Sequence, residues 1–389
     1  MKLLWLPSWY PVKTNPFTGD FLQRHARAVA LYHEVQVIHV VRDENGIVTK
    51  NVKVEESVSH NLKEKIIYYY SPKTGFSVLN KFLSARKYRR LYRQAVKGFI
   101  QQHAAPDLVH VQIAMKAGII ARWIKKKWNI PYVVSEQWTG YLPEAKENFS
   151  DFPYYYRNLC SKVIKDAAAI SVVSNYLGES MKKIFQGISY SVIPNVVDVN
   201  IFKPAVADKS GTTRFIHISG LDHQKNPEDI LKAMAILKQR GHSFHLTMIG
   251  PDRPQLTQMV KELKLQSQVS FHPEVPQEEL VKIMQQSHAL ILYSRYETFG
   301  CVIIESHACG LPVILSDIPV MHENAEEGIN AVFAEKENPA ALAEKLQWFI
   351  QNHQQFNSPA IAFRANSRYN YSVVGTQFTN WYKSVLAKV

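Results

Sequence analysis

Residues 289–316 predict the unit that most constrains the fold, a buried strand followed by a loop, a short helix and a second strand. Residues 289–292 form an apolar run typical of a buried strand, and residues 312–315 begin another. Between them, Gly300 begins an apolar stretch typical of a short buried helix, which ends at Gly310. This order indicates neighbouring strands of a parallel sheet, with the loop at the carboxyl end of a strand. In α/β folds that edge of the sheet is where ligands bind.

Two carboxylates mark this unit as a candidate binding site. Glu297 lies in the loop, and Glu305 lies inside the helix, about 7–8 Å along its axis from Gly300 at ~1.5 Å per residue. The helix amino terminus between them offers unpaired N–H groups and the positive end of the helix dipole, which suit a diphosphate. An acid, an anion site and a second acid match the sugar hydroxyls, phosphates and ribose of a nucleotide sugar. Two acids at this spacing are more often one loop acid and one paired acid, so the surrounding strand and helix pattern decides the interpretation.

The segment from Tyr293 to Ser316 resembles the donor-site motif of the GT-B glycosyltransferases of family 4, also called glycosyl transferases group 1. The resemblance runs nearly end to end and implies an α/β protein with two Rossmann-like domains that face each other across a cleft. It implies that the second domain binds a nucleotide diphosphate sugar and the first binds the acceptor, with retention of anomeric configuration and no metal or other cofactor. Glu297 and Lys225 are the implied catalytic residues. The implied donor-binding residues are Gly19, Lys225, Arg295, Glu297, Phe299, Gly300, Cys301 and Glu305.

Strand and helix patterns alternate through the rest of the chain, which predicts a parallel sheet in each half. The alternation stops after Pro194, and a polar stretch follows at 204–213, which we interpret as the linker between two domains. We therefore expect a first domain over residues 1–195, completed by a returning C-terminal helix over 372–389. The second domain is expected over residues 196–371.

Two loops carry further residues of the resemblance. Gly19 lies before a helix predicted from Asp20, which is placed as its N-cap, and the family usually has a glycine pair there. Lys225 matches a family lysine that holds the donor diphosphate, although alone it would be interpreted as a solvated loop lysine. Gly220 stands where the family often has an arginine, and Arg295 beside the donor loop is the candidate replacement.

Glu136 and Gln137 follow another predicted strand of the first domain. Similar proteins often carry histidine at the position of Gln137, near the reacting sugar. A glutamine cannot act as a general acid or base, so Gln137 is expected to hydrogen-bond the donor sugar or the acceptor. Glu136 is then the candidate for a hydrogen-bonding role or for the role of general base. The alternative for both residues is a structural turn after a strand.

The net charge of +13 belongs to the first half of the chain. Residues 1–204 carry 29 Lys and Arg against 15 Asp and Glu, whereas residues 205–389 carry 17 against 18. The excess peaks in residues 81–100, where seven basic residues accompany aromatic and aliphatic residues at helical spacing. Such a helix is typical of a membrane surface, and a solvated basic face is the equal alternative. Nucleic acid is disfavoured because no nucleic-acid motif accompanies the charge. The predicted membrane contacts are Arg86, Lys87, Arg89, Arg90 and Arg93.

Cysteine usage and hydropathy indicate the compartment. The chain has three cysteines, and its fifteen histidines are scattered without zinc spacing, so we expect reduced thiols and no structural metal. No apolar run is long enough to span a bilayer, and the apolar start is too short for a signal peptide. These features predict a cytoplasmic protein, peripheral at the inner face of the membrane if the basic helix contacts lipid.

The expected function is transfer of a hexose-type sugar to an acceptor hydroxyl, in the synthesis of a cell-surface polysaccharide or glycolipid. The expected partners are a nucleotide sugar, a sugar or lipid-linked acceptor and an anionic membrane surface, without nucleic acid. One alternative is a sugar-nucleotide epimerase of the same architecture, which would need acid and base groups around the sugar. Another is a non-catalytic basic membrane-binding protein. A hydrolase that uses Glu297 and Glu305 as its carboxylate pair is disfavoured because one acid lies inside a helix.

Overall fold

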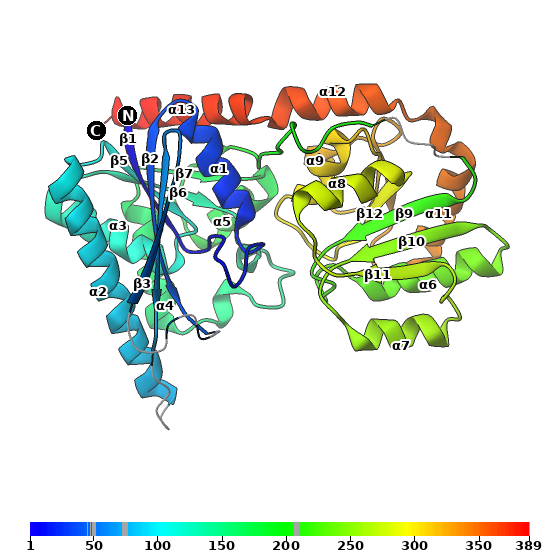
Figure 1. Cartoon of the computed structure of the whole chain (residues 1–389), viewed down its shortest axis with the longest axis horizontal. Helices are drawn as coiled ribbons and strands as arrows, with labels where there is room; N and C mark the ends of the chain where they lie inside the picture. Colours follow the sequence, from blue (N-terminus) through cyan, green and yellow to red (C-terminus); the bar gives the residue numbers. More distant parts are fainter. Residues whose placement is uncertain (45, 47, 49–51, 72–76, 206–209, 389) are drawn as a thin grey trace.

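A computed structural model describes residues 1–44, 46, 48, 52–71, 77–205 and 210–388, which form two α/β domains side by side (Figure 1). The sheet of the first domain has the order β3-β4-β2-β1-β5-β6-β7-β8, and its neighbours are parallel except for β3 against β4. Its apolar central strands are buried, as expected for strands covered on both faces. The strands are β1 (Lys2–Pro7), β2 (Glu34–Arg42), β3 (Val52–Ser59), β4 (Leu62–Tyr69), β5 (Leu108–Gln112), β6 (Tyr132–Glu136), β7 (Ala169–Val172) and β8 (Ser191–Val192).

The first domain also shows how local sequence places helix ends. Ser174, predicted as a cap, accepts a hydrogen bond from the Leu177 N–H at 3.2 Å at the start of α5. Asp20 was the wrong choice of N-cap for α1, because Gly19 holds that position with φ of 74°. A Cβ at Gly19 would lie 2.9 Å from the Trp9 carbonyl carbon, so a side chain there would collide with backbone. The helices are α1 (Asp20–Ala30), α2 (Ser77–His103), α3 (Met115–Trp128), α4 (Tyr154–Asp166) and α5 (Asn175–Ile184), with 3₁₀ turns η1 (Thr139–Tyr141) and η2 (Phe149–Asp151).

The second domain is a parallel sheet in the order β11-β10-β9-β12-β13-β14. The chain leaves β9 toward β10 on one side and later returns to β12 on the other, so a topological switch point lies between β9 and β12. The loop that follows β12 carries Glu297, which places the predicted donor site at this switch point. The strands are β9 (Thr213–Ile218), β10 (Phe244–Ile249), β11 (Val269–His272), β12 (Ala289–Leu292), β13 (Val313–Ser316) and β14 (Ala331–Ala334).

The helices of the second domain include two that the sequence patterns did not predict, α10 and α12. The set is α6 (Pro227–Gln239), α7 (Pro254–Glu262), α8 (Gln277–Gln286), α9 (Cys301–Ala308), α10 (Met321–Asn324), α11 (Pro339–Asn352) and α12 (Ser358–Tyr369), with the 3₁₀ turn η3 (His353–Gln355). The fold class is confirmed, whereas the domain boundaries at residues 195 and 371 stay predictions. Part of the predicted linker, residues 206–209, lies outside the described residues.

The last helix, α13 (Tyr371–Leu386), crosses back to the first domain and packs on α1 (Figure 1). Gly375 makes this contact possible, because a Cβ there would lie 2.3 Å from the carbonyl oxygen of Ala28. The helix also buries Phe378 and Tyr382 against the first domain, where the Tyr382 hydroxyl lies 2.6 Å from His110 Nδ1. The C-terminal helix therefore completes the packing of the first domain.

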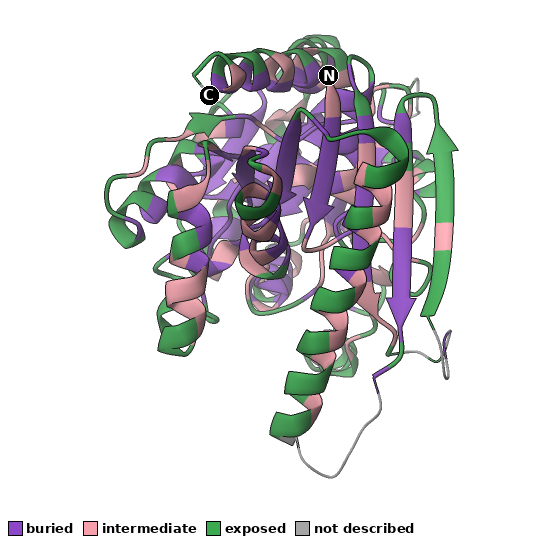
Figure 2. Ribbon diagram, turned by 90° about the vertical axis from the view of Figure 1, so that its left-hand side faces the viewer, coloured by how far each residue is buried: buried purple, intermediate pink, exposed green. Residues whose placement is uncertain are grey.

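Helix α2 is longer than the predicted 81–100 and carries the basic residues along the edge of the first domain. Figure 2 shows its amino-terminal turns extending past the end of the sheet, with exposed residues around them. Exposed apolar side chains accompany the charge there, namely Val78, Leu79, Phe82 and Leu83. No helix in the described ranges combines the length and apolarity needed to cross a bilayer.

We predict that Gly375→Ala destabilises the protein by about 1–3 kcal/mol, as overpacking in a tight contact does. The added Cβ would meet backbone atoms of Ala28, which cannot rotate away. Thermal or urea unfolding measures the change. Gly98→Ala is the matched control, because this glycine also lies inside a helix and its Cβ would meet nothing within 4 Å. The control should be neutral or stabilise by up to ~1 kcal/mol, and equal effects of the two changes would contradict the packing account.

Candidate functional site

A cavity of about 410 Å³ lies between the two domains at the carboxyl ends of their parallel strands. The first domain lines it with loops that follow β1, β6 and β8 and with the start of α1. The second domain lines it with loops that follow β9, β11 and β12 and with the first turn of α9. Of the residues implied by the resemblance, the cavity wall contains Gln137, Lys225, Glu297, Phe299, Gly300 and Cys301.

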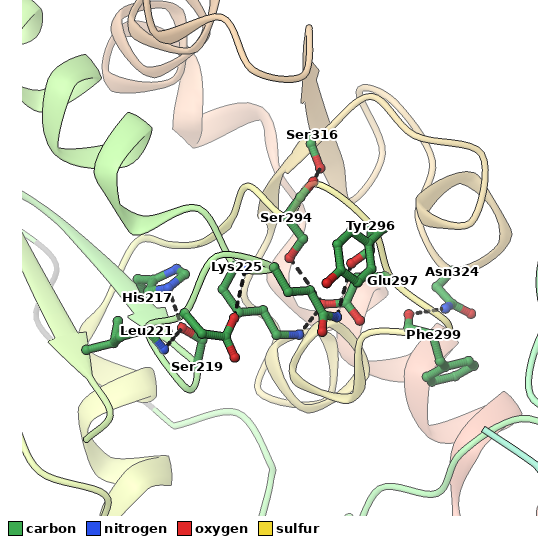
Figure 3. Close-up of polar contacts among 12 residues, drawn as sticks. His217, Ser219, Leu221, Lys225, Ser294, Tyr296, Glu297, Phe299, Ser316 and Asn324 are labelled. Carbon is green, nitrogen blue, oxygen red and sulfur yellow. Dashed lines mark hydrogen bonds and ion pairs between the residues drawn. The ribbon is translucent and has the colours of Figure 1, made fainter. Parts of the chain in front are cut away.

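Lys225 and Glu297 form the charged centre of this wall (Figure 3). The Lys225 ammonium is ion-paired with Glu297 Oε1, which also accepts a hydrogen bond from the Ser294 hydroxyl at 3.1 Å. Glu297 is buried, whereas Lys225 remains partly exposed to the cavity. A buried carboxylate with two donors is held in one orientation, so the pair presents one fixed acid and one cation with spare donors.

A buried histidine shapes the loop that carries Lys225. His217 Nδ1 lies 2.8 Å from the Ile291 carbonyl, and its Nε2 lies 2.7 Å from the Ser219 hydroxyl (Figure 3). Burial lowers the pKa of His217 to about 4, so the ring is neutral and the carbonyl fixes the proton on Nδ1. Ser219 Oγ in turn accepts the Leu221 N–H at 3.0 Å. This chain of bonds anchors the loop at the switch point.

The first turn of α9 lies on the cavity wall where the sequence predicts an anion site, and that role stays a prediction. Gly300 is its N-cap with φ of 81°, and a Cβ there would meet Ile303 at 2.8 Å. Phe299 is fixed by a hydrogen bond from Asn324 to its carbonyl at 2.8 Å. Cys301 begins the helix, and burial raises the pKa of its thiol to about 12, so it is no thiolate nucleophile. The helix therefore offers N–H groups and its dipole to the cavity.

Glu305 lies behind this turn and does not line the cavity. Its Oε1 accepts from Arg24 Nη1 at 2.6 Å, and both side chains are nearly inaccessible to solvent. Arg24 comes from α1, so this ion pair joins the two domains, and Asp20 contacts Arg24 at 3.2 Å beside it. Burial raises the pKa of Glu305, and the Arg24 guanidinium partly offsets that rise. The predicted role of Glu305 toward ribose stays a prediction, and Arg24 is a partner that the sequence did not indicate.

Three other residues of the resemblance lie off the cavity wall. Gly19 packs against the backbone of Trp9 rather than against open space. Arg295 binds the His223 carbonyl at 2.5 Å and Glu337 at 3.1 Å, so it braces the loops around Lys225. At Gly220, where the family often has an arginine, the guanidinium of Arg253 donates to the Gly220 carbonyl at 2.9 Å. A replacement for the missing family arginine therefore stays a prediction.

Glu136 is fully buried beneath the first-domain wall, where it accepts the Ala114 N–H at 2.7 Å and the Tyr141 hydroxyl at 3.1 Å. Burial raises its pKa to about 7. Gln137 does line the cavity, and its amide nitrogen lies 3.4 Å from His25 Nδ1. His25 Nε2 faces the Pro194 carbonyl at 3.1 Å, so Nδ1 is the accepting nitrogen and orients the glutamine amide.

The sequence patterns missed the apolar part of the cavity. Aromatic side chains from three first-domain segments line one side, namely Trp9, Phe17, Phe21 and Trp138. Aliphatic side chains at the ends of second-domain strands and in α8 line another, namely Ile218, Ile249, Val275 and Leu280. Their positions in the sequence could have indicated the cavity, because these residues lie at the ends of parallel strands, in the loops that follow them, or near the start of the next helix. Within the described ranges no cluster of three or more His, Cys, Asp or Glu could hold a metal ion.

The five basic residues predicted for a membrane lie on α2, away from the cavity. Four of them are exposed, whereas Lys87 is half-buried and donates to the Tyr70 carbonyl at 2.7 Å. Arg93 lies 5.2 Å above the Trp123 ring of α3. The basic surface therefore continues from α2 toward α3, whose last turn carries Lys125, Lys126 and Lys127.

Comparisons with known proteins match both halves of the chain. Residues 198–365 match the family model described as glycosyl transferases group 1, and residues 22–201 match the model for glycosyltransferase family 4. A D-inositol 3-phosphate glycosyltransferase of Corynebacterium urealyticum is 24% identical over 323 residues, which are 75% of this chain and 74% of that protein. Sucrose-phosphate synthase of Thermosynechococcus elongatus superposes with a TM-score of 0.80 at 17% identity, over 100% of both chains. HepE of Anabaena superposes with TM-scores of 0.74 in complex with UDP and 0.72 with UDP-glucose, at 16% identity over 99% of this chain and 100% of that one.

We predict that Arg24→Gln destabilises the protein by about 3 kcal/mol at pH 8, because it leaves the buried Glu305 charge unpaired. The loss should shrink toward pH 5. The folded-state pKa of Glu305 is raised, so protonation of Glu305 contributes to stability at low pH, and this contribution is lost as pH rises through that pKa. At low pH the protonated side chain carries no charge, so losing the arginine then costs less. The difference between wild-type and variant unfolding at each pH measures the effect.

The control for this prediction is Arg27→Gln, which removes an exposed arginine of the same helix whose hydrogen-bond partner is Gln23. It should change stability little and equally at both pH values. Asp20 and Cys301 also face the pair, and both residues are present in the wild type and in the variant. A loss from Arg24→Gln that does not depend on pH would contradict the charge account.

Proposed function

Because the chain belongs to the glycosyltransferases of family 4 and has the GT-B fold, we propose that it transfers a hexose-type sugar from a nucleotide diphosphate sugar to an acceptor hydroxyl, with retention. The observation that carries this proposal is the ion pair of Lys225 and Glu297 beside the amino terminus of α9 in the interdomain cavity. A cation and a helix terminus suit a diphosphate, and a fixed carboxylate beside them suits sugar hydroxyls.

The donor is proposed to extend across the second-domain wall. Its diphosphate would accept hydrogen bonds from the first turn of α9 and from Lys225. Its sugar would lie at Glu297, and its base against Ile249, Val275 and Leu280, which form an apolar shelf. A contact of the ribose with Glu305 stays a prediction, because Glu305 lies behind the first turn of α9 and is paired with Arg24. HepE, which shares the fold, was solved with UDP and with UDP-glucose, and this supports a nucleotide sugar as donor.

Retention is proposed to follow a front-face route, in which the leaving diphosphate assists the incoming hydroxyl. The carboxylates on the described cavity wall are Glu274 and Glu297. Glu297 is held by Lys225 and Ser294, and Glu274 is exposed beside the base shelf, so neither is placed as a covalent nucleophile. The protein would then act mainly through Lys225 and the α9 dipole, which stabilise charge that develops on the diphosphate.

An epimerase is less well supported by the same wall. Such an enzyme needs an acid and a base on the sugar, and the first-domain wall offers there the uncharged Gln137, Thr139 and Asn195. The nearest imidazole, His25, lies behind Gln137, and burial lowers its pKa to about 3. Sugar transfer requires no acid or base on this wall, because hydrogen-bonding groups suffice to orient an acceptor.

We also propose that α2 brings the enzyme to an anionic membrane, where it would act on a glycolipid or a lipid-linked polysaccharide precursor. The support is the juxtaposition of four exposed basic residues with the exposed apolar tip Val78–Leu83 of the same helix. Basic residues attract anionic headgroups, and apolar side chains can enter the acyl boundary. Within this proposal the protein is cytoplasmic and peripheral.

Incubation with a panel of nucleotide sugars should give slow hydrolysis and free nucleotide from at least one donor. An epimerase would instead yield a new nucleotide sugar, and a binding protein neither. Lys225→Ala should then lower turnover by about 10²–10³-fold, since its charge matters most in the transition state. Affinity for the donor should fall less than about tenfold. Nucleotide release and thermal shift measure the two quantities.

Lys232→Ala serves as the matched control for Lys225→Ala, because Lys232 also pairs with an acid of the second domain, Asp229, but lies off the cavity. It should leave both quantities unchanged. Equal losses of turnover and affinity from Lys225→Ala would mean that Lys225 binds ground state and transition state alike.

Replacing Arg86, Lys87, Arg89, Arg90 and Arg93 by Gln should abolish sedimentation with vesicles that contain anionic lipid, since each basic residue near such a surface contributes about 1 kcal/mol. High salt should have the same effect on the wild type. Donor hydrolysis in solution should persist, because α2 lies away from the cavity.

The control variant carries Gln at five exposed basic residues of the second domain, and it should sediment like the wild type. These residues are Arg240, Lys261, Lys264, Lys282 and Lys336. If the wild type ignores anionic vesicles at low salt, α2 is an ordinary solvated face and the acceptor is soluble.

A further inference from the structure

We infer that the part of the acceptor that enters the cavity is a neutral sugar ring rather than a phosphorylated sugar or polyol, an inference that rests on the proposed sugar transfer. Three features of the first-domain wall carry it. The wall is aromatic, its polar groups are uncharged amides and a hydroxyl, and the amino-terminal turns of α1, α3 and α5 in the same domain already have carboxylates of the protein.

The aromatic side of the wall comes from the loop after β1, the start of α1 and the loop after β6. Trp9, Phe17, Phe21 and Trp138 contribute the rings, and Phe17 remains 40% exposed. A pyranose has one face of C–H groups that can lie on an aromatic ring, because the ring face is electron-rich and apolar. A phosphate gains nothing from such a surface and would lose its hydration there.

The polar groups on this wall suit hydroxyls. The side-chain oxygen of Asn195 is buried without a hydrogen-bond partner in the described structure, and the residue is 2% exposed on the cavity wall. A buried amide oxygen without a partner costs free energy, which a bound hydroxyl would recover. Gln137 and Thr139 line the cavity beside it. Amides and hydroxyls both donate and accept, which matches the mixed pattern of a sugar.

The wall lacks a cation for an acceptor phosphate. Among the described residues that line the cavity, Lys225 alone is basic, and it belongs to the second domain and is paired with Glu297. Phosphate recognition in proteins relies on Arg, Lys or free helix amino termini. The basic excess of the first domain therefore does not reach this wall.

The amino termini of α3 and α5 are filled by carboxylates, and α1 has a carboxylate in its first turn. The N-cap of α3, Ala114, donates its N–H to Glu136 at 2.7 Å. At the start of α5, the N–H groups of Asn175 and Tyr176 donate to Glu323 of the second domain at 2.7 and 2.8 Å. Helix α1 has Asp20 in its first turn, where it repels an anion. An acceptor phosphate would compete with these protein carboxylates, whereas a neutral ring would not.

The test uses matched acceptors on the full-length protein, with the nucleotide sugar that the donor panel identifies. Methyl glucoside and octyl glucoside are compared with glucose 6-phosphate and inositol 3-phosphate. Acceleration of nucleotide release measures transfer, and saturation-transfer NMR from aromatic protons measures binding without donor. Neutral glycosides should exceed the phosphorylated compounds at least tenfold in both measurements.

Two variants tie the preference to this wall. Phe17→Ala should weaken neutral-sugar binding about fivefold or more, and Phe17→Tyr should retain it, because tyrosine keeps the ring. Asn195→Ala should also weaken it, through loss of the unpaired amide. Phe363→Ala is the matched control, since Phe363 is 73% exposed on α12 and off the cavity.

Equal or tighter binding of the phosphorylated compounds overturns the inference. Failure of every neutral sugar to bind, or binding that ignores both Phe17→Ala and Asn195→Ala, overturns it as well. Failure of the proposed function looks different, because the wild type would then neither bind nor consume any nucleotide sugar in the donor panel.

Discussion

The ion pair between Arg24 and Glu305 is the interaction on which the closed cleft depends. The two residues lie 281 positions apart, one on α1 of the first domain and one on α9 of the second. Both charges are removed from solvent where the domains meet, so in the closed arrangement Glu305 needs Arg24 as its partner, and Arg24 also contacts Asp20 of its own helix. A second contact across the cleft, from Glu323 to the start of α5, holds the same arrangement. The cavity and its two walls follow from this closure.

The two walls divide the chemistry by charge. On the second-domain wall, the Lys225 ammonium and the amino terminus of α9 lie beside Glu297, which Lys225 holds in place, and Glu274 is exposed on the same wall. In the first domain, Glu136 adds no charge to the cavity wall, because it is buried beneath that wall and accepts a hydrogen bond from the Ala114 N–H. Lys225 and the amino terminus of α9 therefore face an uncharged aromatic surface. This difference between the walls suits the proposed transfer from a charged donor to a neutral acceptor.

Several elements were predictable because their signals are local. The apolar strands and the Gly300–Gly310 helix follow from residue patterns a few positions long, and Ser174 caps α5 as expected. The N-cap of α1 was wrongly predicted as Asp20, because the choice between Gly19 and Asp20 depended on the nearby backbone of Trp9, which no local pattern shows. Helix α12 was missed because its packing against α9, rather than a strong pattern of its own, places it.

The sequence by itself determined a parallel α/β architecture, the loop with Glu297 as a candidate site, and the excess of positive charge in the first half, whereas Lys225 became a candidate through the family resemblance. Only the tertiary structure decided which side chains meet. It paired Lys225 with Glu297, gave Glu305 an arginine from the other domain, and placed Glu136 beneath the cavity wall rather than on it. The physical reason is that periodicity and capping act over a few residues, whereas the partner of a buried charge is set by which strands and helices pack together, however distant they are in the chain.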